Sequence, residues 1–333
     1  MPLVAIRGTD ISWTCKPGDT IMRAALRAGL GFPYECNVGS CGNCRFDLIE
    51  GEIEELRQDP PGLQERDRAR GRRLGCQSAP LGDCIIKARL MPQYQNRFRP
   101  QITSARLIET RDITHDIREF RFQLERQQPF QAGQYALLSV PGVNGQRAYS
   151  MANTGETGGQ WHFQIKRVPG GGATGALFDR VSTGNEIIVD GPYGMAWLRE
   201  DAPRDIVCIA GGSGLSPMIS IARTFAASPQ LKGRRLDFIY GGRAARDICG
   251  AEMLEALPGF GQTLFYHPAV SSETESWDGY RGFVHDVASE LFGVHLADRE
   301  IYFAGPPMMG EAMQKMLLAH GVPPEQIHFD QFY

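Results

Sequence analysis

The spacing of hydrophobic and polar positions changes along this chain, and the changes divide it into regions. Within residues 1–92, VAIRG and DISWTC alternate as two short strands, and TIMRAALRAGL then places apolar residues at helical spacing. A cysteine-containing loop and the alternating segment DCIIKARL follow. Two strands, a helix, a loop and a strand predict a small β-grasp domain.

From residue 101 to residue 200 the pattern is one of short strands separated by Gly and Pro turns. The segments are ITSARLIET, IREFRFQLE, GQYALLSVP, RAYSMAN, WHFQIKRV and NEIIVDGPYG. No helical period begins before about residue 173, so we predict a closed antiparallel β-barrel. Residues 93–100 are polar and bounded by proline, and we interpret them as a linker.

Residues 201–333 predict a third domain, of the α/β class. The apolar run DIVCIA enters a glycine-rich turn and then a helical pattern, and LDFIYGGR and EIYFAGPPMMG are two further strands that end in small residues. Such strands, joined by helices, indicate a parallel sheet. The whole chain is therefore expected to be multidomain, with α+β and α/β parts.

Composition and charge exclude several kinds of partner. The 333 residues carry a formal net charge of −3, with 22% charged residues, so no polybasic surface indicates nucleic acid or an anionic membrane. Residues 1–92 are nearly neutral, with 12 acidic and 13 basic side chains. No apolar run approaches the roughly 18 residues of a membrane span, and MPLVAIRGTDISW lacks a basic leader, so we expect a cytoplasmic protein.

Four of the eight cysteines form a candidate metal centre. Cys36, Cys41 and Cys44 have C-x4-C-x2-C spacing, and Cys76 follows in RRLGCQ, which is the plant-type [2Fe–2S] arrangement. The alternative is structural zinc, which usually shows paired C-x2-C motifs, whereas the chain has one. In a reducing cytosol such a group indicates a metal before disulfides.

Two further features surround this centre. Gly39 and Gly42 allow the loop to turn its N–H groups toward the sulfurs. Cys15, Cys84, Cys208 and Cys249 are expected to be packed thiols. The acidic run 47–56 is interpreted as a solvated face, with docking on a basic partner as the alternative.

RAYSMAN is a second chemical signal. Arg147 is a planar cation suited to a diphosphate, Tyr149 is a flat ring that can stack, and Ser150 has a hydroxyl that can donate to a ring nitrogen. Arginine and tyrosine two positions apart in a strand share a face. By itself the pattern is also typical of an ordinary strand.

The third signal is the turn GGSGLSP, which lacks the G-x-G-x-x-G of a standard dinucleotide fingerprint. Strand, Gly-rich turn and helix present backbone N–H groups to a dinucleotide diphosphate. The candidate residues are Gly211, Gly212, Gly214 and, in the first turn of the helix, Pro217. Gly305 and Pro306 follow a neighbouring strand, at the edge of an open α/β sheet where ligands bind.

Taken together, these motifs resemble a known family. Residues 1–92 look like a plant-type ferredoxin domain, and FQAGQY, RAYSMAN, VPGGGATGAL and GGSGLSP follow in the order of the ferredoxin–NADP reductase family. The resemblance implies FAD, with Arg147 and Gly171 on its pyrophosphate and Thr174 near a helix N-terminus beside it. It places Tyr149 and Ser150 at the reacting isoalloxazine as the catalytic contacts. Relatives have cysteine where this chain has Ala304, so no thiol role is assigned there.

The domain order resembles NADH-dependent reductase components of bacterial aromatic-ring oxygenases. The resemblance implies an NADH-dependent oxidoreductase in which electrons pass from NADH through FAD and the [2Fe–2S] cluster, singly, to an oxygenase or ferredoxin component of a dioxygenase or diiron monooxygenase. One alternative is a stand-alone NAD(P)H iron–sulfur flavoreductase for another acceptor enzyme. Another, of a different class, is a noncatalytic iron–sulfur carrier or redox sensor.

Two finer expectations rest on this resemblance. Asp247 in YGGRAARD can accept from ribose hydroxyls and repel a 2′-phosphate, which favours NADH over NADPH, although Arg243 and Arg246 argue the other way. The C-terminal Phe332 and Tyr333 either cover the flavin or form a packed tail.

Overall fold

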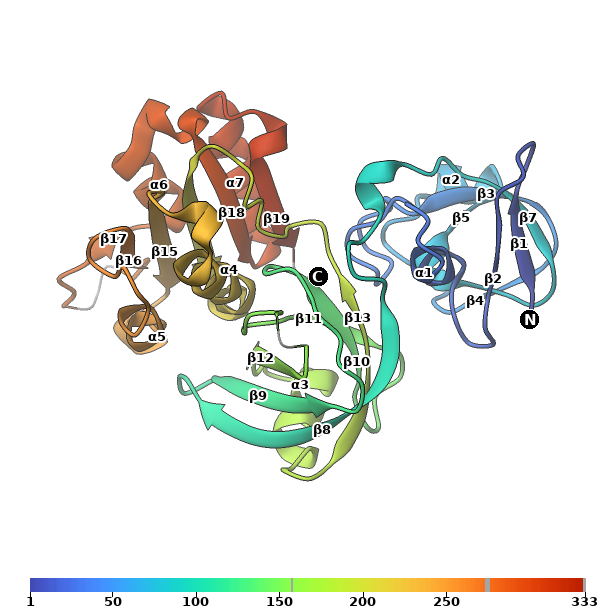
Figure 1. The fold of residues 1–333 in the computed structure, drawn as a ribbon, viewed down its shortest axis with the longest axis horizontal. Helices are drawn as coiled ribbons and strands as arrows, with labels where there is room; N and C mark the ends of the chain where they lie inside the picture. The colour runs from blue at the N-terminus through green and yellow to red at the C-terminus, as the bar shows by residue number, and fades with distance from the viewer. Residues whose placement is uncertain (157, 273–275, 332–333) are drawn as a thin grey trace. The chain divides into compact units, whose positions relative to one another are not determined.

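A computed structural model describes residues 1–156, 158–272 and 276–331 (Figure 1). The chain forms two compact units: Met1–Ile102 with Asp190–Gly194, and Thr103–Val189 with Met195–Tyr333. The expected Phe332 and Tyr333 contacts lie outside the described residues. No helix within these described ranges is both long and apolar enough to cross a membrane.

The first unit contains a five-stranded sheet in the order β2-β1-β7-β3-β5. Its strands are β1 (Leu3–Ile6), β2 (Ser12–Thr14), β3 (Arg45–Glu50), β5 (Arg72–Leu74) and β7 (Cys84–Lys87). The smaller pair is β4 (Ile53–Glu55) and β6 (Ser78–Pro80), and the helices are α1 (Ile21–Arg27) and α2 (Glu65–Ala69). Strand β3 is antiparallel to both β5 and β7, whereas β1 is parallel to β7. The predicted β-grasp plan is confirmed.

Helix α1 supplies much of the core of this unit. Thr20 caps the helix by accepting a hydrogen bond from the N–H of Arg23 at 3.3 Å, which satisfies a backbone donor of the first turn. Ile21 and Met22 are fully buried, as is Val4 of β1. The alternating pattern of β1 and the helical spacing of α1 thus turn their apolar side chains to one core.

Residues 101–193, most of which belong to the second unit, form a barrel sheet in the order β11-β10-β13-β8-β9-β12. Its strands are β8 (Gln101–Asp112), β9 (Ile117–Leu124), β10 (Tyr135–Ser139), β11 (Arg147–Ser150), β12 (Gln160–Lys166) and β13 (Glu186–Tyr193). A bridge between Met151 and Phe163 joins the two edges, so the antiparallel barrel is nearly closed. Helix α3 (Gly172–Arg180) follows β12 and buries Leu177 in the barrel core.

Strand β13 passes from the second unit into the first. Asp190, near its end, binds the guanidinium of Arg27 through contacts of 2.7 and 2.8 Å. Arg27 also binds Asp19 at 2.8 Å, and the hydroxyl of Tyr193 donates to Asp190 at 2.9 Å. Residues 190–194 are therefore held in the first unit by buried polar contacts as well as packing.

The C-terminal region is a six-stranded sheet in the order β17-β16-β15-β14-β18-β19, and its neighbouring strands are parallel. Its strands are β14 (Asp205–Gly211), β15 (Leu236–Gly242), β16 (Leu264–Val270), β17 (Tyr280–Arg281), β18 (Arg299–Gly305) and β19 (Ile327–Gln331). The helices are α4 (Leu215–Ala227), α5 (Ala251–Glu255), α6 (Val284–Phe292) and α7 (Pro307–Ala319). Short 3-10 turns are η1 (Gly75–Gln77), η2 (Pro92–Tyr94), η3 (Gly212–Gly214), η4 (Pro229–Leu231), η5 (Ala245–Asp247), η6 (Gly293–Asp298) and η7 (Pro324–Gln326).

Both faces of the parallel sheet are covered. Ile206 and Cys208 of β14 join one apolar core together with α4, while Val207 and Ile209 join a second core on the other face. This two-sided burial explains why DIVCIA reads as a continuous apolar run. The expected fold class, a β-grasp domain, an antiparallel barrel and a parallel α/β sheet, is confirmed, while the boundaries at residues 92, 100 and 200 stay predictions.

Candidate functional site

The first candidate site is the cysteine loop. Cys36, Cys41 and Cys44 lie between α1 and β3, and Cys76 lies in η1, just after β5. The N–H of Gly75 donates to the carbonyl of Cys44 at 2.8 Å, which brings the two segments together. The four sulfurs form two pairs: the Sγ atoms of Cys44 and Cys76 are 3.4 Å apart, and the thiols of Cys36 and Cys41 are hydrogen-bonded to each other.

Backbone N–H groups of the loop point at the sulfurs. The N–H groups of Ser40 and Cys41 donate to Cys36 Sγ at 3.3 and 3.2 Å. Hydrogen bonding from the Cys41 thiol and from backbone N–H groups lowers the pKa of Cys36 to about 6. Hydrogen bonding from Cys44 likewise lowers the pKa of Cys76, whereas the hydrogen bonds to Cys36 and Cys76 raise the pKa of Cys41 and Cys44. Each pair of thiols therefore stabilises one thiolate.

Glycine is required where this loop turns. Gly39 and Gly42 have φ of +84° and +79°, in the left-handed region that side chains rarely adopt, as expected from the sequence. A Cβ on Gly42 would also lie 2.5 Å from the carbonyl oxygen of Gly62. The turn is thus fixed both by backbone conformation and by close packing.

The four thiols form two pairs, which is the ligand arrangement of a two-iron centre. Within the described ranges, no three or more His, Cys, Asp and Glu side chains surround one position for a metal ion. A [2Fe–2S] cluster takes two thiolates on each of two irons, whereas structural zinc draws four ligands around one ion. Two pairs of sulfurs therefore fit the cluster. The buried Nδ2 of Asn37, next to Cys36, has no partner in this part of the chain, and cluster sulfides are acceptors it could use.

The second candidate site is on β11, which pairs with β10. Arg147 is exposed, Tyr149 is half-buried and Ser150 is 4% exposed. The guanidinium of Arg147 donates to the carbonyls of Asn144 and Gln146 at 3.2 and 3.1 Å and has no carboxylate partner among the described residues. It is a cation available to a diphosphate, as FAD requires.

Neutral hydroxyls and a glycine turn lie on the same barrel. Burial raises the pKa of Tyr149 to about 12, so its phenol is uncharged at neutral pH. Gly171 caps α3, and a Cβ there would lie 2.7 Å from Thr174 Oγ1. That oxygen accepts from the N–H of Val168 at 3.1 Å, so Thr174 shapes the turn at the start of the helix. A glycine turn at a helix N-terminus is an arrangement that can bind an anionic diphosphate.

The third candidate site lies at the carboxyl edge of the parallel sheet. Strand β14 ends at Gly211, and β18, its parallel neighbour, ends at Gly305. A Cβ on Gly211 or Gly305 would meet Met309 Sδ at 2.8 or 2.6 Å, so the side chain of Met309 lies against both. A Cβ on Gly214 would lie 1.9 Å from the carbonyl oxygen of Ala304, so the turn packs directly on β18.

The other predicted residues lie around this edge. Gly212 has φ of +57°, Pro217 is buried in the first turn of α4, and Pro306 is exposed at the start of α7. One carboxylate oxygen of Asp247 accepts from the N–H groups of Arg243 and Ala244, both at 3.1 Å. Asp247 thus has a structural task that the sequence did not indicate. Its other oxygen lies 3.7 Å from His115 Nε2.

Ser216, which the sequence did not single out, joins the second and third sites. Its Oγ donates to the carbonyl of Ser150 at 2.6 Å and accepts from the N–H of Gln164 at 3.2 Å. One turn further along α4, Ser220 Oγ donates to the carbonyl of Asn153 at 2.7 Å. A serine at helical spacing within GGSGLSPMIS is the signal that was available, but its partner lies 66 residues earlier.

Comparison with known families gives three consecutive matches. Residues 4–81 match the 2Fe-2S iron-sulfur cluster binding domain. Residues 104–197 match the oxidoreductase FAD-binding domain, and residues 208–315 match the oxidoreductase NAD-binding domain. The three matches follow the order of the three candidate sites, and they confirm the expected [2Fe–2S], FAD and nicotinamide cofactors.

Known relatives and a solved structure match this chain over nearly its whole length. The chain is 38% identical to the ferredoxin–NAD(P)+ reductase CarAd of Metapseudomonas resinovorans, with 96% of each chain covered. It is 33% identical to the xylene/toluene monooxygenase electron transfer component XylA of Pseudomonas putida, covering 99% of this chain and 93% of the relative. Among solved structures, the ferredoxin reductase in carbazole 1,9a-dioxygenase has a TM-score of 0.92 at 34% identity, covering 100% and 98% of the two chains.

Proposed function

The chain belongs to the family of ferredoxin–NAD(P)+ reductases that serve as reductase components of oxygenases, and from this premise we propose how it divides the work among its residues. It is an oxidoreductase that passes electrons from a nicotinamide dinucleotide through FAD and a [2Fe–2S] cluster to an acceptor protein. The acceptor that we propose is the oxygenase or ferredoxin component of an aromatic-ring oxygenase. This proposal is supported by the names of the relatives, which include dioxygenase and monooxygenase systems.

The cofactors supply the redox chemistry, and the protein supplies position and electrostatics. When bound, FAD takes a hydride from the nicotinamide and releases the two electrons singly, and the cluster carries one electron at a time. Cys36, Cys41, Cys44 and Cys76 hold the cluster in this proposal, and the N–H groups of Ser40 and Cys41 offset its negative charge. No side chain is needed as a general acid or base.

At the flavin, Arg147 and the Gly171 turn hold the diphosphate, while Tyr149 and Ser150 contact the isoalloxazine ring. Gly211, Gly212 and Gly214 present backbone to the nicotinamide dinucleotide. The observation that carries this assignment is the Ser216 contact, which joins the carbonyl of Ser150 to the first turn of α4 at 2.6 Å. One hydrogen bond thereby couples the strand of the flavin site to the glycine turn of the nicotinamide site.

We propose NADH as the preferred donor, with NADPH a poorer one. Asp247 lies 16% exposed beyond the end of β15, where its carboxylate disfavours a 2′-phosphate. The exposed Arg243 and Arg246 oppose this preference. A kcat/KM for NADH at least tenfold above that for NADPH is expected, and equal values would show that the arginines dominate.

The acceptor class has a second candidate. The reductase subunit of an aromatic O-demethylase from Amycolatopsis is 34% identical to this chain, and a structure called the Amycolatopsis cytochrome P450 reductase GcoB aligns with a TM-score of 0.84. A cytochrome P450, which is an oxygenase that contains haem, is therefore the alternative acceptor. We propose a cytoplasmic location, because four cysteines spaced for a metal centre and four further buried thiols suit a reducing compartment.

Anaerobic titration with NADH tests the electron path. The flavin absorbance should bleach, and the electron paramagnetic resonance (EPR) signal of a reduced [2Fe–2S] cluster should appear as NADH is added. Bleaching without the EPR signal would contradict the path beyond FAD. In a second, steady-state assay, purified dioxygenase, diiron monooxygenase and P450 components are each supplied as the electron acceptor. The kcat/KM values for these acceptors then compare the acceptor classes.

A further inference from the structure

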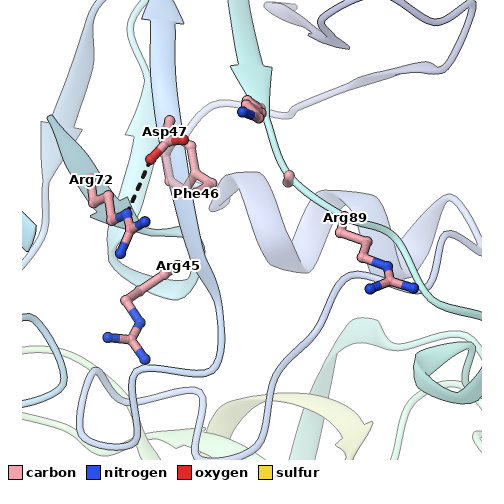
Figure 2. Close-up of a pocket in the computed structure, with 7 residues that line it drawn as sticks. Arg45, Phe46, Asp47, Arg72 and Arg89 are labelled. Carbon is pink, nitrogen blue, oxygen red and sulfur yellow. Dashed lines mark ion pairs between the residues drawn. The ribbon is translucent and has the colours of Figure 1, made fainter. Parts of the chain in front are cut away.

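The ferredoxin unit has a basic hollow beside its cysteine loop. Seven residues line a cavity of about 370 Å³, which we call the basic hollow: Arg45, Phe46, Asp47, Arg72, Lys87, Ala88 and Arg89. Figure 2 shows the guanidinium groups of Arg45, Arg72 and Arg89 spread across it, with Arg72 paired to Asp47. Four of the seven side chains are cations and one is a carboxylate.

Strand register places this hollow at the cluster edge of the sheet. Because β3 is antiparallel to β5 and β7, the start of β3 and the ends of β5 and β7 lie at the same edge. Cys44 immediately precedes β3, and Cys76 follows β5 by two residues. Arg45, the first residue of β3, and Lys87, the last of β7, therefore lie at the edge that carries two of the proposed cluster ligands.

The hollow keeps an excess of positive charge. The buried carboxylate of Asp67 accepts from Arg45 and Arg72 at 3.0 and 2.9 Å, and Asp47 lies 3.4 Å from Arg72. The four cations of the hollow, together with the carboxylates of Asp47 and Asp67, give a net charge of +2. Lys87 and Arg89 are exposed, and neither makes an ion pair or side-chain hydrogen bond within the described ranges.

The acidic run 47–56 is mostly exposed, as expected of a solvated face, and only part of it is paired with arginines of the described ranges. Asp47 belongs to the basic hollow, and Glu55 is paired with Arg73 at 2.7 Å. Glu50 ends β3, about 17 Å from Arg45 along a six-residue strand. Glu54 and Glu55 lie on β4, which pairs with β6 just after Cys76, so this part of the run is a separate, acidic surface. Within the part of the chain that the structure describes, the unpaired charges of the basic hollow itself, those of Lys87 and Arg89, are positive.

We propose that the basic hollow is the docking site for an acidic patch on the protein that accepts electrons from the cluster. This inference rests on the proposed function, since it names the surface through which the cluster meets its acceptor. Aspartate and glutamate side chains of the partner enter between Lys87 and Arg89, where the ammonium group of Lys87 and the guanidinium of Arg89 can bind carboxylates. Complementary charge speeds encounter and orients the partner with its redox centre toward Cys44.

Charge reversal tests the docking site with two protein acceptors of opposite charge. The probes are the soluble cytochrome b5 domain, which is acidic, and cytochrome c, which is basic. The variants are Lys87→Glu and the double variant Lys87→Glu with Arg89→Glu, neither of which breaks an ion pair of the described chain. Lys16→Glu, at an exposed residue between β2 and α1, is the control matched in net charge to Lys87→Glu.

At low ionic strength, kcat/KM for cytochrome b5 should fall about tenfold in the double variant, while that for cytochrome c stays level or rises. High salt should remove the difference, because exposed charges are screened. Lys16→Glu should leave the ratio of the two acceptors unchanged. The NADH-reduced EPR signal and ferricyanide reduction should match those of the unaltered protein in every variant.

An unchanged acceptor ratio in the double variant would overturn the docking site, as would a change of this ratio in Lys16→Glu equal to that in Lys87→Glu. Reduction of cytochrome c but not of cytochrome b5 by the unaltered protein at low ionic strength would also overturn it. If NADH does not reduce the cluster of the unaltered protein, the proposed function itself is contradicted. Failure of the docking site and failure of the proposed function are therefore distinguishable.

Discussion

The cysteine loop and the dinucleotide sites are built in different ways. In the cysteine loop, three of the four candidate ligands lie within nine residues, and the N–H groups that donate to their sulfurs belong to the same segment. The flavin and nicotinamide sites depend on contacts between distant segments, such as Ser216 with Ser150 and the Gly214 turn with Ala304. The loop carries its chemistry locally, whereas the dinucleotide sites acquire theirs through the packing of the second unit.

This difference predicts how each region responds to substitution. Removing a ligand from the cysteine loop should abolish one cofactor and leave the other unit intact. In the dinucleotide sites, a small change in packing should alter rate without removing the cofactor, because reacting groups that are misplaced by about 1 Å can lose a hundredfold in rate.

The largest effect is expected from Cys41→Ala. Loss of one thiol from the Cys36–Cys41 pair should prevent cluster assembly, so the EPR signal of the reduced cluster should vanish and transfer to cytochrome c should nearly cease. NADH-dependent ferricyanide reduction should persist, since ferricyanide can take electrons from the flavin. Cys84→Ser, at a buried thiol of β7 outside the loop, is the control and should keep the signal. Persistence of the signal in Cys41→Ala would remove Cys41 from the ligand set.

The same difference decides what could be read from the sequence. The C-x4-C-x2-C spacing predicted the cluster because the ligands and their turn glycines are close along the chain. Alternation of apolar and polar residues predicted the strands of the barrel, and the continuous apolar run of β14 predicted a strand of the parallel sheet. Both patterns are direct consequences of which faces of a strand are buried. Cys15, Cys84, Cys208 and Cys249 are buried, as expected.

Contacts between distant residues carried no such signal. Arg27 lies in the helical segment TIMRAALRAGL, where nothing in the sequence indicates that it binds Asp190, 163 residues later. Asp247 was assigned to a ribose, but its carboxylate also caps backbone N–H groups of its own turn. The basic hollow was hidden because residues 1–92 are nearly neutral as a whole, and only strand register gathers Arg45, Arg72 and Lys87.

A close approach in the nicotinamide site should give the next largest effect. In Gly214→Ala the new Cβ would lie 1.9 Å from the carbonyl oxygen of Ala304, so the turn must move away from β18. Flavin reduction by NADH should slow about a hundredfold in stopped-flow measurements, with a loss of about 1–3 kcal/mol in the free energy of unfolding. Gly82→Ala, where a Cβ would meet nothing within 4 Å, is the control. A rate unchanged in Gly214→Ala would mean that the turn does not position the dinucleotide.

Arg147→Ala should weaken FAD binding by about ten- to a hundredfold. The guanidinium has no carboxylate partner among the described residues, and a hydrogen bond to a charged group is worth about 1.5–3 kcal/mol. Arg147→Lys should lie between, because an ammonium keeps the charge but lacks the planar donor pair. Arg126→Ala, at an exposed position after β9, is the control for lost charge. Equal FAD dissociation constants in all four proteins, measured by flavin fluorescence, would remove Arg147 from the diphosphate site.

The smallest effect, and the sharpest test of coupling between the dinucleotide sites, is expected from Ser216→Ala. This change removes the hydroxyl that donates to Ser150 at 2.6 Å and accepts from Gln164 at 3.2 Å, both in a buried position. Loss of such a hydrogen bond costs about 1 kcal/mol, so hydride transfer should slow about fivefold while FAD content and the EPR signal stay unchanged. Ser220→Ala is the matched control, since it removes a 2.7 Å bond one turn further along α4, to Asn153 rather than to the flavin strand. We expect Ser220→Ala to slow the step less, because Ser220 does not touch Ser150. Equal slowing in both variants would show that α4 is held as a whole and that Ser216 has no positioning role of its own.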